Sequence, residues 1–304
     1  MAPSSSLLRM IQIVAFALFM LFCGATAAVP LGSQAVLVVD NRTGKVLLEK
    51  NAGLVVPIAS LTKLMTAMVV LDARLDMAER ITIDRQDVDT LKHSRSRVPV
   101  GARLSRADTL HLALMSSDNR AAAALARTYP GGRAAFQAAI DAKLRALGMR
   151  HTRLHEPTGL SPANTSTARD LARMAAAAAR YPAIARLTTD RRDVIRVNGR
   201  QVEYHNTNRL VGARGWNVRL SKTGYTNEAG RCLIMRIRAA GKGATMILLN
   251  AGSSAARIAD ALHIRRLVAG RDSTKAGTAV ARVAKRIKRT NRSKAVTARK
   301  RRHR

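Results

Sequence analysis

Apolar and polar positions divide the chain into strand-like ends and a helical middle. Ala35–Val39 and Lys45–Glu49 are β-prone runs, and the turn sequence Asn41–Gly44 between them predicts a hairpin. Strand-like runs return after about residue 190, and a final helical pattern comes after them. These runs cover residues 194–197, 218–222, 232–237 and 245–249, and the helix covers 254–268.

Between these ends the pattern is helical. Residues 60–71 and most of residues 105–180 favour helices, with a break at Tyr129–Gly132 and a loop at 155–164. Strands at both ends with helices between them predict one sheet assembled from N- and C-terminal segments, with a helical subdomain inserted. The expected fold class is therefore α/β.

The N-terminus differs from this body. Arg9, the apolar run Met10–Phe22 and the small-x-small sequence Ala25–Ala27 predict a signal peptide over residues 1–28. A retained membrane anchor is the alternative, although the run is shorter than the roughly 20 residues that a span requires. Removal of the signal leaves Cys232 as the single thiol, so we expect no internal disulfide and a buried cysteine in a strand.

Charge separates a C-terminal tail from the body. The 304-residue chain has a formal net charge of +34, and residues 271–304 contribute 14 Lys/Arg and one Asp. This tail has almost no large apolar side chain, which predicts disorder in isolation. We therefore expect a domain over residues 29–270 and a basic tail over 271–304 that is attracted to an anionic membrane or wall surface. An aromatic content of 3% and the export signal argue against a nucleic-acid partner.

Ser60–Lys63 (SLTK) is the first of three motifs that carry chemistry. No other Lys in the chain has Ser three positions before it. The spacing places the Ser60 hydroxyl and the Lys63 amine on one helical face, one turn apart, which suits proton transfer from a nucleophile to a base. Taken alone, the pair is more typical of a helix cap and a surface lysine.

The second motif, Ser117–Asn119 (SDN), is the only Ser-x-Asn in the sequence. Ser117 is suited to relay a proton and Asn119 to hold a substrate amide. A loop or a helix cap is the structural alternative, because Ser, Asp and Asn commonly serve there.

The third motif, Lys222–Gly224 (KTG), lies on a strand that is expected to begin near Val218. An edge strand with a glycine lets a peptide approach and pair as an added strand. Lys222 and Thr223 are then placed to receive a substrate carboxylate. An ordinary strand end that leads into a turn is the structural alternative.

Together and in this order, the motifs resemble those of penicillin-binding proteins and class A β-lactamases. From about Ala35 to Ala269 the chain resembles the low-molecular-mass penicillin-binding proteins, the D-alanyl-D-alanine carboxypeptidase and endopeptidase family. Further family-like segments are residues 37–44, 156–161, 166–171 and 205–210. The resemblance implies a penicillin-binding/β-lactamase-like fold, with an antiparallel sheet flanked by helices.

The resemblance also implies roles for the motif residues. Ser60 attacks a D,D-amide of a peptidoglycan stem peptide to give an acyl-enzyme, Lys63 is the base, and Ser117 passes the proton to the leaving amine. The backbone amides of Ser60 and Tyr225 form the oxyanion hole. The substrate-binding residues are Asn119, Lys222, Thr223, Gly224 and Tyr225. β-Lactam antibiotics are implied as acylating inhibitors.

The role of base makes a physical demand on Lys63. A free lysine has a pKa near 10.4, so burial or a neighbouring cation has to lower the pKa of Lys63 before it can accept a proton. Lys222 is the expected neighbouring cation.

Two alternatives compete with a peptidase. A class A β-lactamase uses a glutamate after the Ser-x-Asn motif, and Glu156 lies 37 residues after Asn119, but Leu160 stands where that family has an asparagine. A basic surface- or nucleic-acid-binding protein explains the charge, but not the ordered motifs.

The segment after residue 270 bears on the choice between endopeptidase and carboxypeptidase. Typical carboxypeptidases of the resembled family have a second, β-rich domain and an amphipathic anchor there, whereas here that segment is only the basic tail. The chain therefore resembles the endopeptidase branch, which acts on crosslinked muropeptides in the periplasm. Its histidines lack metal-ligand spacing, so we expect no metal, and no cofactor is implied.

Overall fold

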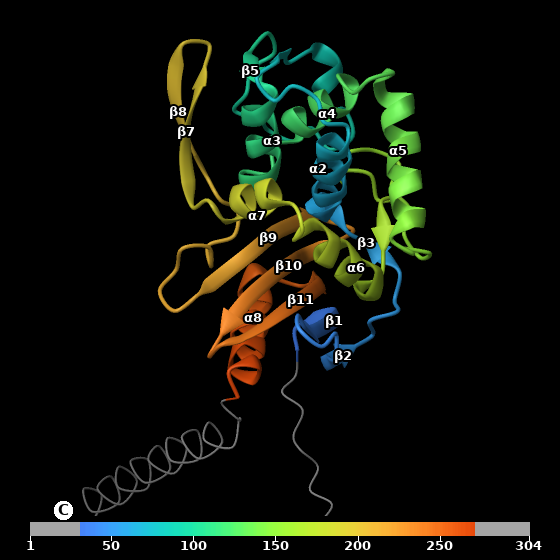
Figure 1. Ribbon diagram of the computed structural model, residues 1–304, viewed down its shortest axis with the longest axis vertical. Helices are drawn as coiled ribbons and strands as arrows, with labels where there is room; N and C mark the ends of the chain where they lie inside the picture. Colours follow the sequence, from blue (N-terminus) through green and yellow to red (C-terminus); the bar gives the residue numbers. More distant parts are fainter. Residues whose placement is uncertain (1–30, 271–304) are drawn as a thin grey trace, which may run out of the picture. The chain divides into compact units, whose positions relative to one another are not determined.

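The computed structural model describes residues 31–270 (Figure 1). The expected signal peptide over residues 1–28 and the basic tail over 271–304 lie outside these residues. Within them, no helix is both long and apolar enough to cross a membrane.

One antiparallel sheet joins the two ends of the described chain, as the sequence predicts. Its strands are arranged in the order β2-β1-β11-β10-β9, so strands from the N-terminal part pair with strands from the C-terminal part. The strands are β1 Ser33–Asp40, β2 Val46–Lys50, β9 Asn217–Thr226, β10 Gly230–Ala239 and β11 Lys242–Ala251. Because β9 is an edge strand, no further strand of this sheet pairs with the KTG motif on its outer side.

Helices cover both faces of this sheet (Figure 1). α8 (Ser254–Val268) packs on β10 and β11, whereas α6 (Ala168–Ala178) packs on β1 and β11 and α7 (Pro182–Thr189) packs on β9. The inserted subdomain contains the remaining α-helices of the described chain. These are α2 Lys63–Asp72, α3 Arg106–Met115, α4 Asn119–Arg127 and α5 Gly132–Ala146.

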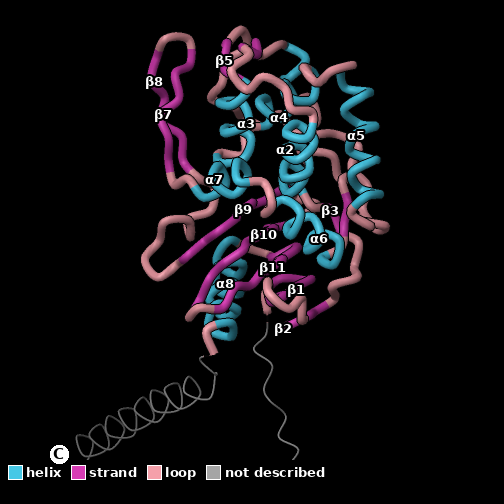
Figure 2. Tube along the Cα trace, viewed as in Figure 1, coloured by secondary structure: helices cyan, strands magenta, loops and turns pink. Residues whose placement is uncertain are grey.

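Three small strand pairs complete the described fold. A hairpin of β7 (Arg192–Val197) and β8 (Arg200–His205) extends beside α3 in Figure 2. The other pairs are β3 (Val56–Pro57) with β6 (Thr165–Ser166), and β4 (Arg80–Thr82) with β5 (Arg103–Ser105).

The core is built around α2, which is buried on nearly every side. All its residues from Lys63 to Val70 are buried, and Leu64, Met65 and Met68 have no exposed surface. A helix that is apolar all round belongs in the interior. Its first residue, Lys63, is therefore carried into the core between the helical subdomain and the sheet.

Candidate active site

Ser60 lies in a strained turn at the start of α2. The turn is a short 3₁₀ segment, η1 (Ala59–Thr62), and Ala59 has a left-handed φ of 48°. Two glycines press against this turn. A Cβ at Gly159 would lie 1.9 Å from the Ala59 carbonyl oxygen, and a Cβ at Gly224 would lie 3.2 Å from the Ser60 nitrogen. Three chain segments that are far apart in sequence therefore fix the position of the Ser60 hydroxyl.

The Lys63 amine lies directly beside that hydroxyl. Its Nζ atom is 2.8 Å from Ser60 Oγ, 2.6 Å from Asn119 Oδ1 and 2.7 Å from the carbonyl oxygen of Thr158. The side chain has no exposed surface, and this burial lowers the pKa of Lys63 to about 8, against the opposing charges of nearby carboxylates. The predicted Ser60–Lys63 pair is therefore assembled in the fold.

Ser117 and Lys222 form a second hydroxyl–amine pair. Lys222 Nζ lies 2.8 Å from Ser117 Oγ, and it also donates to the carbonyl of Thr223 at 3.0 Å. Ser117 has a φ of 60°, an uncommon value for a residue other than glycine, which turns the chain sharply before α4. Burial first, then the charge of Lys63, lowers the pKa of Lys222 well below its usual range.

Burial is the main cause of the lowered pKa of each lysine, and the expected interaction between Lys63 and Lys222 acts on both. The charge of Lys63 contributes to the lowered pKa of Lys222. Two ammonium groups in one buried site oppose each other's protonation.

Asn119, the first residue of α4, connects Lys63 to Ser94 by hydrogen bonds. Its Oδ1 accepts a hydrogen bond from Lys63, and its Nδ2 donates to Ser94 Oγ at 2.7 Å. The neighbouring Asp118 caps α4 by accepting from the amide of Ala121. Asn119, expected to hold a substrate amide, is thus also a structural partner of Lys63.

A glutamate organises the loop that supplies the third acceptor of Lys63. The Glu156 carboxylate accepts from the amides of Thr158 at 2.7 Å and Gly159 at 2.6 Å, and from Asn164 Nδ2 at 3.0 Å. Both carboxylate oxygens of Glu156 thus accept hydrogen bonds from residues of its own loop. This arrangement does not resemble a free general base, which weakens the β-lactamase alternative.

A pocket of about 450 Å³ opens over these groups. Of the predicted residues, Ser60, Ser117, Thr223, Gly224 and Tyr225 line it. Lys63 and Lys222 are buried beneath its floor, where they hydrogen bond to the two serines. Sequence reasoning missed the other residues of the lining, namely Thr207, Arg209, Arg231, Ser254, Arg257 and Ile258.

The missed residues make this pocket basic. Arg209, Arg231 and Arg257 line it, and its lining has no Asp or Glu. Arg231 stacks on the Tyr225 ring at 3.4 Å, and Arg257 Nη1 donates to the Cys232 carbonyl at 3.1 Å. Arg209 lies in the family-like segment 205–210, which is the one signal that pointed to it. The other two had no pattern to separate them from the 53 Lys and Arg residues of the chain.

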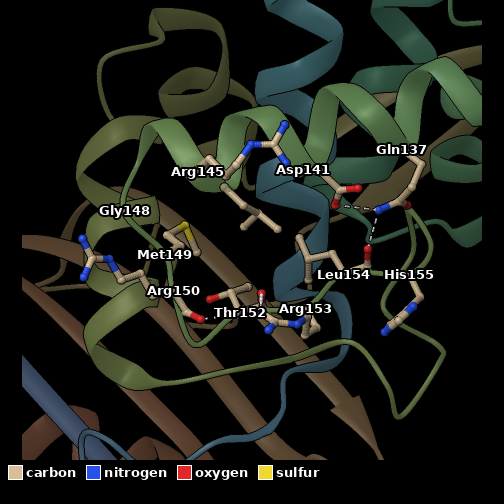
Figure 3. A pocket seen from close by; sticks show the side chains of 11 residues that line it. Gln137, Asp141, Arg145, Gly148, Met149, Arg150, Thr152, Arg153, Leu154 and His155 are labelled. Carbon is tan, nitrogen blue, oxygen red and sulfur yellow. Dashed lines mark hydrogen bonds between the residues drawn. The ribbon is translucent and has the colours of Figure 1, made fainter.

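Another hollow, of about 660 Å³, lies between α5 and the loop before Glu156 (Figure 3). Gln137 is one of its lining residues and donates to Asp141 Oδ1 and to the Leu154 carbonyl. None of the motif residues lines this hollow, so we place the active site at Ser60. Within residues 31–270, no group of three or more His, Cys, Asp and Glu side chains is placed to hold a metal ion.

The assembled groups have the properties that acyl transfer requires. A hydroxyl nucleophile touches an amine whose pKa is lowered, and a second hydroxyl faces the same pocket with its own lysine. The strand edge beside them offers backbone groups to an extended peptide.

The chain is similar to curated proteins named as D-alanyl-D-alanine peptidases. Residues 24–253 match the family model described as D-alanyl-D-alanine carboxypeptidase. The D-alanyl-D-alanine endopeptidase of Pseudomonas aeruginosa is 48% identical over 238 residues, covering 78% of this chain and 77% of the relative. That of Escherichia coli is 46% identical over 243 residues, covering 79% of this chain and 78% of the relative.

Solved structures agree with these relatives. The Streptomyces DD-transpeptidase matches with a TM-score of 0.72 and 27% identity, covering 79% of this chain and 97% of that one. A penicillin-binding protein of Listeria monocytogenes, in its ampicillin-bound form, matches with a TM-score of 0.68 and 28% identity, covering 80% of this chain and 99% of that one.

Proposed function

Because the chain belongs to the D-alanyl-D-alanine carboxypeptidase family, we propose that it is a serine DD-peptidase that cleaves D,D-amide bonds of peptidoglycan through an acyl-enzyme on Ser60. The observation that carries the proposal is the 2.8 Å contact between Ser60 Oγ and a buried Lys63 amine. The predicted antiparallel α/β fold of this family is confirmed by the sheet and by the solved relatives.

In the acylation step, Lys63 takes the proton of Ser60 while Oγ attacks the carbonyl carbon. With a pKa of about 8, roughly a tenth of Lys63 is neutral at pH 7, compared with about three in ten thousand for a pKa of 10.5. Burial thus raises the fraction of Lys63 that is neutral at pH 7 about 300-fold. The hydrogen bonds to Asn119 and Thr158 hold the amine in place for the transfer.

The carbonyl oxygen becomes an oxyanion during this attack. We assign the amides of Ser60 and Tyr225 as its donors, because Gly224 brings β9 against the Ser60 nitrogen. A side chain at position 224 would separate the two amides. Losing one such donor typically costs about 3–4 kcal/mol in the barrier.

The tetrahedral intermediate then expels an amine, which needs a proton. Ser117 lines the same pocket as Ser60 and accepts a hydrogen bond from Lys222, so Ser117 can donate its proton to the amine. The proton that Lys63 took from Ser60 then replaces the one that Ser117 gave up, so the step balances and Lys63 is neutral again. Water later attacks the Ser60 ester and releases the acyl product. β-Lactams enter the first half of this cycle and leave a stable Ser60 adduct.

We favour crosslinked muropeptides as the substrate. The two relatives at 46–48% identity are D-alanyl-D-alanine endopeptidases. The three arginines of the pocket support this preference, because a leaving stem peptide carries more carboxylates than a single D-alanine. Arginine pairs with carboxylates through two parallel hydrogen bonds.

Mass spectrometry of muropeptides digested by the protein tests this function. Conversion of crosslinked dimers to monomers is the expected result, and Ser60→Ala should abolish both this conversion and labelling by a fluorescent penicillin. Release of terminal D-alanine alone would overturn the endopeptidase preference. Rapid penicillin hydrolysis without a persistent adduct would instead favour the β-lactamase.

We also propose that the protein acts in the periplasm, exported by residues 1–28, and that residues 271–304 attract it to an anionic membrane or wall surface. The tail's 14 Lys/Arg against one Asp support this attraction. Fractionation of a chain that ends at Gly270 tests it. Membrane or wall association equal to that of the full chain would refute a role for the tail.

A further inference from the structure

Five arginines surround a second basic pocket, away from Ser60. It has a volume of about 700 Å³, and residues of α7, of the start of β9 and of the turn from β10 to β11 line it. None of its lining residues lines the catalytic pocket. The arginines, which we call the arginine pocket, are Arg42, Arg186, Arg219, Arg236 and Arg238.

Separate elements bring these side chains together. Arg42 belongs to the β1–β2 turn and Arg186 to α7, while the other three lie on β9 and β10. A bulge contributes to the convergence: Leu220 pairs with Arg236, and Val218 pairs with the next residue of β10. The extra residue on β9 is Arg219, which stands at the bulge. The pocket is thus a product of the tertiary fold.

These guanidinium groups have few protein partners. Within residues 31–270, no carboxylate lies within salt-bridge distance of any of the five. Their one side-chain hydrogen bond there is a long one of 3.4 Å, from Arg238 Nε to the Gly241 carbonyl. The Asp40 carboxylate accepts from the amides of Thr43 and Arg42 in the turn, and these hydrogen bonds, with a smaller contribution from the charge of Arg42, lower the pKa of Asp40.

The lack of a charged partner is most unfavourable for Arg236, because its side chain is half-buried. Burial lowers the pKa of Arg236, and no neighbouring charge opposes that effect. A desolvated cation without a partner destabilises a fold, and a bound anion offsets that cost. The other four arginines are more exposed and present their donors to the same space.

The shape and lining of the pocket restrict the anion. The space is concave, and its lining has no aromatic residue, so it lacks the stacking groups typical of single-stranded nucleic-acid sites. It also lacks the exposed Trp, Phe or Leu with which proteins insert into a bilayer interface. Discrete charged groups on a flexible chain fit better, and guanidinium pairs bidentately with carboxylate.

We propose that the arginine pocket binds carboxylates of a second stem peptide of peptidoglycan, and so acts as an anchoring site apart from the catalytic pocket. This inference rests on the proposed function, because the substrate polymer carries free carboxylates on its stems. Arg219 and Thr223 lie four residues apart on β9, which corresponds to roughly 13 Å along the strand. A polymer can occupy both sites at once, and the second contact then raises its effective concentration at the first.

Co-sedimentation with isolated peptidoglycan sacculi tests the proposal, with Ser60→Ala as the background so that the polymer is not digested. Adding Arg186→Gln, Arg236→Gln and Arg238→Gln should weaken binding about tenfold. The matched control replaces Arg145, Arg150 and Arg153, three arginines of the α5 hollow, by Gln (Figure 3). It changes the net charge equally and should weaken binding less than twofold. Equal loss in both variants, or loss in neither, would overturn the proposal.

A comparison of native with amidated sacculi identifies the anion. Sacculi whose carboxyl groups have been amidated should bind the unsubstituted and the arginine-pocket variants equally. Arginine-dependent binding that persists on amidated sacculi, or that appears only on phosphatidylglycerol vesicles, would contradict a carboxylate ligand.

Penicillin labelling of each variant with Ser60 intact should be unchanged. Absence of labelling in the unsubstituted protein would count against the proposed function, whereas the difference in sedimentation between the two triple-arginine variants reports on the arginine pocket.

Thermal unfolding separates binding from a structural role. Because Arg236 is half-buried and unpaired, Arg236→Met should leave the midpoint unchanged or raise it by about 2 °C. A lowered midpoint would show that Arg236 supports the fold, and would overturn its assignment to a ligand.

Discussion

Lys63 shows how burial prepares a single side chain for catalysis. Lowering its pKa from 10.5 to about 8 corresponds to ~3 kcal/mol of preference for the neutral form. Between pH 8 and 10.5 the folded protein therefore holds fewer protons at this site than the unfolded chain does. Linkage then requires the contribution of Lys63 to stability to become more favourable as pH rises through that window. Below pH 8 the fold carries the full cost of the buried ammonium.

The same pKa predicts how acylation depends on pH. Because the base must be neutral, the rate of Ser60 acylation by a penicillin should rise about tenfold per pH unit below 8 and level off above it. Stopped-flow measurement of labelling between pH 6 and 10 checks this. A flat profile across that range would contradict Lys63 as the base.

Gly159 is a second residue on which the site depends. Its φ of +84° disfavours any side chain, and a Cβ there would collide with the Ala59 carbonyl at 1.9 Å. Gly159→Ala should therefore lower the free energy of unfolding by about 3 kcal/mol and slow acylation more than 100-fold. Denaturant unfolding and penicillin labelling measure the two effects.

Gly101 provides the control for backbone strain. It has the same φ of +84°, but a Cβ there meets no atom within 4 Å. Gly101→Ala should cost only about 1–2 kcal/mol and leave acylation unchanged. Equal effects of the two substitutions on acylation would show that strain alone, and not the contact with the Ser60 turn, is responsible.

At the scale of elements, the loop that begins at Glu156 supports the base. One carboxylate oxygen accepts from Gly159 and Asn164, and the other accepts from the amide and hydroxyl of Thr158. In Glu156→Gln, either orientation of the new amide points its NH₂ at a backbone N–H. An unmet buried donor costs about 1–3 kcal/mol, so the loop and its Lys63 contact should loosen.

We therefore expect Glu156→Gln to slow acylation of Ser60, with little effect on the lifetime of the adduct once formed. Separate measurement of penicillin labelling and adduct decay tests this. Glu203→Gln, on the exposed β8 strand, should change neither rate. Selective lengthening of the adduct lifetime by Glu156→Gln, with normal labelling, would instead show a water-activating glutamate.

Long elements with a strong pattern could be predicted from the sequence. The hairpin of β1 and β2, strands β9 to β11 and helix α8 occur where their apolar runs are, and Cys232 is buried in β10 as expected. The short β8 was missed, because its side chains are mostly exposed and leave no apolar run. The helix expected from residue 60 instead begins as a 3₁₀ turn, since contacts with Gly159 and Gly224 override local propensity there.

The candidate site was predictable for a different reason. Ser60, Lys63, Ser117 and Lys222 stand in short motifs, and the fold brings them together in two hydrogen-bonded pairs. The roles of Arg231 and Arg257 could not be predicted, because each depends on which distant strand or helix it faces. Such tertiary proximity leaves no trace in the spacing of residues along the chain.

At the scale of the whole molecule, charge opposes folding. The formal net charge is +34, so like-charged side chains repel one another across the described domain and beyond it. Salt screens this repulsion, with a Debye length of about 10 Å at 0.1 M. The thermal midpoint should therefore rise as sodium chloride increases from about 50 to about 300 mM. A falling midpoint would show that attractive ion pairs such as Arg127 with Asp87 outweigh the repulsion.

Sulfate extends this argument from general screening to a specific site. At equal ionic strength, a divalent oxyanion that several guanidinium groups can share should raise the midpoint further than chloride does, because it binds the folded state alone. Sulfate also strengthens apolar burial in any protein, so the comparison needs the arginine-pocket variant. In the variant with Arg186→Gln, Arg236→Gln and Arg238→Gln, sulfate should still raise the midpoint by strengthening apolar burial. The additional rise that comes from sulfate bound to the arginine pocket should be lost. If sulfate raised the midpoint equally in both proteins, only the net charge of the molecule would affect its stability, and the five arginines would not bind an anion as a site.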